Sequence, residues 1–84
     1  MQIYCMDGFN MSVIDKDEMP FAYCDKDSVE VGFPSEQEDW LLPFMESDDS
    51  GDGPTQSVYS YVPHEVVHKV IMKHGGKKDD LTNR

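Results

Sequence analysis

Apolar residues alternate with polar ones near the start of this chain, which is the pattern of strands that bury one face. From Phe9 to Val13 every second residue is apolar, and residues 2–6 form another strand-like run. The Asp7-Gly8 pair between them suits a two-residue type I′ turn, because both central positions of that turn need a positive φ. The sequence therefore predicts a β-hairpin over residues 2–14.

A second hairpin is expected further along the chain. Residues 21–24 are apolar, Asp25-Lys26-Asp27 has the composition of a turn, and residues 28–33 alternate again with Val29 and Val31 on the apolar side. Residues 57–62, rich in Tyr and Val, are a fifth strand candidate.

The residues after Pro34 predict a short helix. Ser35 and Glu38 have the spacing of a capping box, in which each side chain accepts a hydrogen bond from a free N–H of the first turn. Trp40, Leu41, Phe44 and Met45 supply its apolar side, and Pro43 ends it early.

A second helix is predicted after Pro63, which occupies the position of a first helical residue. Val66, Val67, Val70 and Ile71 form an apolar stripe at helical spacing. Gly75-Gly76 is expected to end this helix as a C-cap.

Together these elements predict an α+β fold with the order β-β-β-β-α-β-α. We expect a mostly antiparallel sheet of four to five strands with two short helices on one face. Residues 1–76 form the single domain, and residues 77–84 are expected to be a disordered charged tail.

The most conspicuous motif is His64-Glu65-Val66-Val67-His68, an H-E-x-x-H run. On a helix it places two imidazoles one turn apart, as zinc proteases require. His74 has the spacing of the third ligand in the metzincin signature, which this run resembles, but the glycine of that signature is Ile71 here. A continuing helix would turn His74 away from His68, so we expect ordinary surface residues, no metal and no cofactor.

Acidic residues dominate the first two thirds of the chain. Residues 1–56 hold 14 of the 17 acids but only two lysines, within a net charge of −10. Such a surface repels nucleic acid and anionic membranes, and it attracts basic proteins. We therefore expect a partner-binding surface formed by Asp25, Asp27, Glu30, Glu36, Glu38, Asp39, Trp40, Asp48, Asp49 and Asp52.

In size and acidity the chain resembles the small phage or mobile-element inhibitors of bacterial defence, of the anti-CRISPR and DNA-mimic type. That resemblance implies an inhibitor that is not an enzyme and that occupies the basic surface of a nucleic-acid-binding host protein in the cytoplasm. The cytoplasm is also expected because Met1 to Asp7 lacks the features of a signal peptide. Two alternatives stay open: a zinc module or metal-dependent hydrolase using His64 and His68, and a small accessory or structural subunit.

Overall fold

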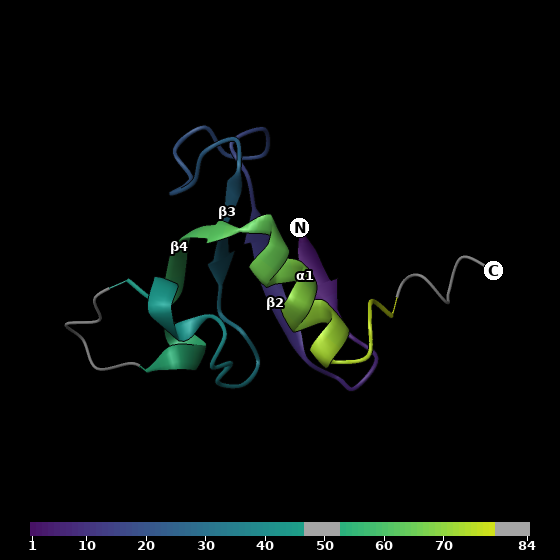
Figure 1. The fold of residues 1–84 in the computed structure, drawn as a ribbon. Helices are drawn as coiled ribbons and strands as arrows, with labels where there is room; N and C mark the ends of the chain where they lie inside the picture. The colour runs from purple at the N-terminus through teal and green to yellow at the C-terminus, as the bar shows by residue number, and fades with distance from the viewer. Residues whose placement is uncertain (47–52, 79–84) are drawn as a thin grey trace.

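The computed structural model describes residues 1–46 and 53–78 and has an α+β fold. Four strands form one antiparallel sheet in chain order: β1 (Gln2–Tyr4), β2 (Asn10–Ile14), β3 (Ser28–Gly32) and β4 (Val58–Pro63). The helix α1 (His64–Lys73) crosses one face of this sheet, and two 3₁₀ turns, η1 (Leu42–Phe44) and η2 (Pro54–Gln56), lie beside β4 (Figure 1). The α+β class and the antiparallel sheet are confirmed, with one α-helix among the described residues in place of two.

The first hairpin forms as predicted, but its turn differs. The Cys5 carbonyl accepts a hydrogen bond from the Gly8 N–H, and the Cys5 N–H donates to the Phe9 carbonyl. This is the pattern of a three-residue loop, in which only Gly8 has a positive φ (98°). The Asp7 carboxylate accepts from the Phe9 N–H at 2.9 Å, so Asp7 caps the turn and does not adopt the left-handed backbone of a type I′ turn.

The predicted strand at residues 21–24 is absent. Residues 15–27, called loop 15–27 below, connect β2 directly to β3, and these strands pair with Val13 opposite Val31. The Cys24 N–H donates to the Ala22 carbonyl two residues earlier, a tight turn that no strand allows. Ala22 and Cys24 are nevertheless buried and anchor the loop.

The predicted helix at residues 35–45 is also absent, apart from η1. Ser35 does not cap a helix: its hydroxyl accepts from the Asn10 N–H, and its own N–H donates to the Asn10 carbonyl. The Glu38 carboxylate accepts from the Trp40 N–H and not from the Ser35 N–H, which a capping box requires. Both capping side chains are therefore committed to other partners.

The helix α1 is confirmed. Val67, Val70 and Ile71 are buried against the sheet. Its C-terminal end is a Schellman motif, in which the Gly76 N–H donates to the Ile71 carbonyl and the Gly75 N–H to Met72. Gly75, the residue after the C-cap, has the positive φ (91°) that this motif requires, and Gly76 also has a φ of 91°. Pro63 is the N-cap and not the first helical residue, so the helix begins one residue later than predicted.

The residues after α1 return to the edge of the sheet. The Met6 N–H donates to the Gly76 carbonyl, the Lys78 N–H donates to Tyr4, and Cys5 forms a bridge with Lys77. Lys77 and Lys78 thus pair with the first hairpin, which differs from the tail expected from residue 77 onwards. Residues 79–84 lie outside the described residues.

The core lies between α1 and the covered face of the sheet. Ile3, Met11, Val31 and Val62 are among the side chains that it buries. Cys5 and Cys24 are buried free thiols. In the described ranges, no helix has the length and apolar character needed to cross a membrane.

Candidate functional site: acidic surface and buried histidine cluster

The predicted partner-binding residues occupy three places in the fold. Asp25 and Asp27 are exposed in loop 15–27, Glu30 is half-buried in β3, and Glu36, Asp39 and Trp40 are exposed in the segment that precedes η1. Asp48, Asp49 and Asp52 lie outside the described residues.

Glu38 is a correction to this set. Its side chain is 1% exposed, so it cannot contact a partner. The segment from Gly32 to Leu41 turns this carboxylate inward, where it meets the end of α1. Glu38 was expected on the surface because a residue in the first turn of the predicted helix would face water.

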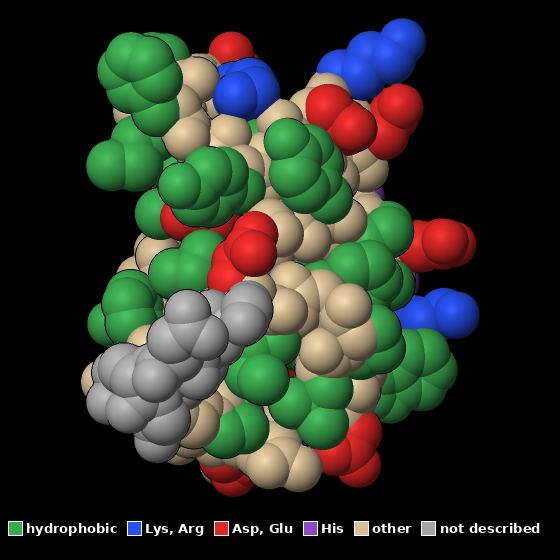
Figure 2. Space-filling model, turned by 90° about the vertical axis from the view of Figure 1, so that its left-hand side faces the viewer, with side chains coloured by type: hydrophobic (Ala, Val, Ile, Leu, Met, Phe, Trp, Pro, Cys, Tyr) green, Lys and Arg blue, Asp and Glu red, His purple; other side chains and the backbone are tan. Residues whose placement is uncertain are grey.

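Carboxylates on the surface outnumber the cations that could neutralise them. In residues 1–46 and 53–78, Glu38 is the only carboxylate paired with a lysine, and Glu18 pairs with the N-terminal ammonium. Lys16 instead donates to two backbone carbonyls of loop 15–27, and Lys69 lies over the Trp40 ring at 5.1 Å. On the side that carries β4, acidic side chains lie among hydrophobic ones, with lysines near the top and the right-hand edge (Figure 2). The negative field of the acids therefore extends into solvent.

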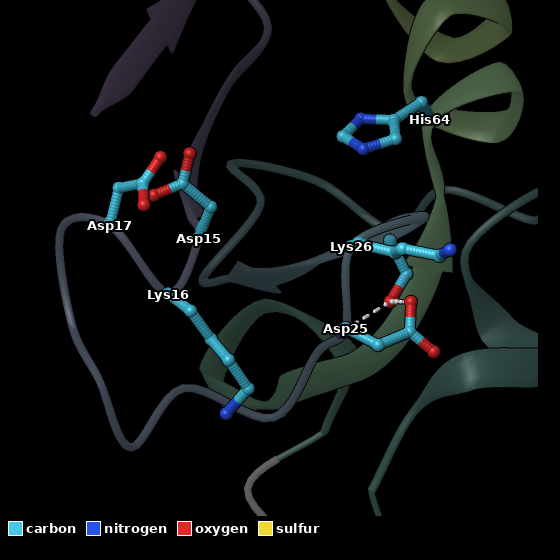
Figure 3. Close-up of a pocket in the computed structure, with 7 residues that line it drawn as sticks. Asp15, Lys16, Asp17, Asp25, Lys26 and His64 are labelled. Atoms are coloured by element: carbon cyan, nitrogen blue, oxygen red, sulfur yellow. Dashed lines mark hydrogen bonds between the residues drawn. The ribbon is translucent and has the colours of Figure 1, made fainter.

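An open depression of about 390 Å³ lies between the start of α1 and the two ends of loop 15–27, residues 15–17 and 25–27, which are called the legs of the loop (Figure 3). It is lined by Asp15, Lys16, Asp17, Asp25, Lys26, Ser28 and His64. Figure 3 shows Asp15 and Asp17 on one side, Asp25 and Lys26 on another, and His64 across from them. Hydrogen bonds from the Asp27 N–H and the Ser28 hydroxyl lower the pKa of Asp25, so this carboxylate stays ionised near neutral pH.

Among the described side chains, the H-E-x-x-H residues find no partners that would complete a metal site. His64, Glu65 and His68 are exposed on α1. In the part of the chain that the structure describes, no group of three or more His, Cys, Asp or Glu side chains could hold a metal ion.

His74 has a role that the sequence did not indicate. Its side chain is 6% exposed and lies between two carboxylates: the Nδ1 is 2.6 Å from the Asp7 Oδ2, and the Nε2 is 2.9 Å from the Glu38 Oε1. The Phe9 ring stacks on the imidazole with centroids 4.1 Å apart. Because both ring nitrogens face acceptors, His74 is a cation here. The only sequence signal was its position before the capping glycines, where a helix ends.

The ionisation of this cluster follows from its geometry. Burial alone lowers the pKa of His74, but the hydrogen bonds to Asp7 and Glu38 and their charges outweigh burial and raise it. Burial likewise raises the pKa of Glu38, and hydrogen bonds from Trp40, His74 and Lys73 outweigh it, so the net shift is downward. The Phe9 N–H and then His74 lower the pKa of Asp7. The cluster is therefore a hydrogen-bonded ion network that ties three segments together.

Comparison of the chain with family models, with curated proteins and with solved structures found no match. Any function assigned to it must therefore come from its own surface and chemistry.

Proposed function

We propose that this chain is a small acidic binding protein that inhibits a nucleic-acid-binding host protein by occupying its basic surface. The mode is that of a DNA mimic or an anti-CRISPR protein, acting in the cytoplasm without catalysis. The observation that carries this proposal is the shortage of internal ion pairs: nearly all described carboxylates lack a lysine partner. Free carboxylates remain available to the lysines and arginines of another molecule.

The chemistry of a phosphate-binding surface supports this partner class. Such surfaces present Lys and Arg side chains to a dense row of negative charges. Carboxylates in loop 15–27, in β3 and before η1 offer charges from several elements of one small domain. We assign partner contact to Asp25, Asp27, Glu30, Glu36, Asp39 and Trp40, and also to Asp48, Asp49 and Asp52 outside the described residues. Long-range attraction would accelerate association, and exposed aromatic side chains would prolong the complex.

A displacement assay tests the proposal. Bacterial DNA-binding proteins are loaded on immobilised DNA, and the purified chain is used as the eluent. We expect it to release a defined subset of these proteins, with a yield that falls about tenfold or more between low and moderate salt. Release that does not change with salt, or no release, contradicts the proposal.

Two matched double variants locate the effect. Asp25→Asn with Asp27→Asn removes two charges from the assigned surface, and Glu46→Gln with Glu65→Gln removes two from exposed positions outside it. The first pair should weaken displacement more than the second, although net charge changes equally. His64→Asn with His68→Asn should leave displacement unchanged, whereas a loss would favour the zinc alternative.

A further inference from the structure

Large hydrophobic side chains project from loop 15–27. Phe21 is 92% exposed, and Met19 and Tyr23 are 53% and 56% exposed. Tyr61 of β4, also 53% exposed, lies next to Tyr23 because its N–H donates to the Tyr23 carbonyl at 2.9 Å. Met19, Phe21, Tyr23 and Tyr61 are together called the aromatic surface, after the three that are aromatic. Phe21 in particular contributes almost nothing to the interior, so the stability of the fold does not explain why a phenylalanine occupies this position.

Internal hydrogen bonds hold the loop in one conformation. The Lys16 ammonium donates to the carbonyls of Pro20 and Ala22, at 3.2 and 3.0 Å. The Tyr23 N–H donates to the Glu30 carboxylate at 3.0 Å, which ties the loop to β3. Buried Ala22 and Cys24 fix its underside. A partner that binds Phe21 therefore meets a preorganised loop, which reduces the entropy lost on binding.

The backbone at Tyr61 is strained. Val29 pairs with Val62 and Val31 with Tyr59, so β4 has one extra residue opposite β3. In this bulge Tyr61 has φ of 53°, which is unfavourable for a bulky side chain. The bulge places an exposed tyrosine beside Tyr23. Strained residues of this kind cluster at binding sites.

We infer that the aromatic surface, together with the carboxylates of loop 15–27, is the part of the partner-binding surface that anchors the basic partner. The inference rests on the proposed function and specifies the chemistry of the partner: an apolar pocket on a protein, edged by Lys or Arg side chains. Phe21 fills that pocket, and the partner's basic side chains meet the acids on the two legs of the loop. These acids are Asp15, Asp17, Asp25 and Asp27.

The negative charge of loop 15–27 favours a basic protein over two other possible occupants, a nucleic acid and a second copy of this chain. A nucleic acid would bring its phosphates against the acidic legs of the loop, which is unfavourable. A second copy of this chain would place two acidic loops face to face, so like charges oppose a symmetric dimer. A basic protein is the occupant that benefits from both the aromatic side chains and the acids.

A peptide-display selection against the folded chain tests the inference. We expect enriched peptides that combine Lys or Arg with a large apolar residue. The strongest peptide is then titrated into the labelled chain, and amide chemical shifts should change most in loop 15–27 and at Tyr61. Phe21→Ser should weaken this peptide by about tenfold or more. Phe33→Ser is the matched control, because Phe33 is also exposed (54%) but follows the opposite end of β3. It should leave the affinity unchanged.

The outcomes separate the face from the function. Basic peptides that bind elsewhere on the chain would overturn the face and leave the proposed function standing. Peptides without basic residues that need Phe21 would keep a docking site at Phe21 but overturn the basic partner and the proposed function. No enrichment, or equal effects of the two serine variants, overturns the inference. So does a doubled mass in solution that Phe21→Ser abolishes, since the occupant would then be a second copy.

Discussion

Asp7 and His74 are 67 positions apart in the sequence, yet the Asp7 Oδ2 and the His74 Nδ1 are only 2.6 Å apart. The contact joins the turn of the first hairpin to the end of α1. Glu38 binds the other ring nitrogen, so a third segment joins at the same imidazole. The cluster fastens these segments together in a small protein whose core is limited.

The first prediction concerns pH. The pKa of His74 is raised above its usual 6.5, so its contribution to stability is complete below pH 6.5 and is lost as pH rises through the folded-state pKa. The pKa values of Asp7 and Glu38 are lowered below 3.8 and 4.5, so their contribution is present above those values and is lost as pH falls through the folded-state pKa values. Urea midpoints should therefore be highest between about pH 5 and 6.5 and fall on both sides.

A histidine control identifies the origin of the alkaline limb of this profile. The variant His68→Asn changes an exposed imidazole on α1 and should keep the whole profile. His74→Asn should lower stability and flatten the loss above pH 6.5. If His74→Asn leaves that limb intact, His74 is not the group that titrates.

The second prediction compares two glutamates two positions apart. Glu38→Ala removes a buried carboxylate and leaves His74 without one of its two acceptors. We expect a loss of about 3–5 kcal/mol in the free energy of unfolding, as for other broken buried ion pairs. Glu36→Ala, at an exposed position, should change it by about 0.5 kcal/mol or less. Chemical denaturation measures both, and equal effects would show that the buried cluster contributes little.

The third prediction uses the two capping glycines, which share a φ of 91°. A Cβ on Gly75 would lie 3.1 Å from the Met6 Cβ, whereas one on Gly76 meets nothing within 4 Å. Gly76→Ala should cost about 1–2 kcal/mol from left-handed strain alone. Gly75→Ala should cost more, because Met6 must also move. Thermal unfolding of the two variants measures the difference, and a smaller loss for Gly75→Ala would contradict the packing described.

The fourth prediction links stability to binding. Asn tolerates a left-handed backbone better than Tyr does, so Tyr61→Asn should raise the free energy of unfolding by about 0.5–1 kcal/mol. The same variant should weaken the peptide selected through the aromatic surface. Tyr4→Asn, at an exposed position in β1, should instead destabilise, because Asn disfavours strands. If Tyr61→Asn instead lowers the free energy of unfolding, the positive φ of Tyr61 does not strain the backbone as we infer.

The candidate site could be predicted only in part. The acidic surface follows from composition, because carboxylates that have few lysines to pair with must face solvent wherever the chain folds. The histidine cluster could not be predicted, since Asp7, Glu38 and His74 come together only after the sheet and α1 have packed. The H-E-x-x-H run contains His64 and His68, which are exposed, whereas the buried imidazole is that of His74 at the C-cap of α1.

The sequence by itself determined the elements whose signals are local. Alternating apolar residues specified β2 and β3, the stripe from Val66 to Ile71 specified α1, and Gly75-Gly76 specified its end, since only glycine adopts that backbone without strain. The tertiary structure decided the fate of residues 35–45, where Ser35 and Glu38 had the spacing to start a helix. Ser35 bonds to Asn10 and Glu38 bonds to His74, and partners so distant in the chain leave no trace in local spacing.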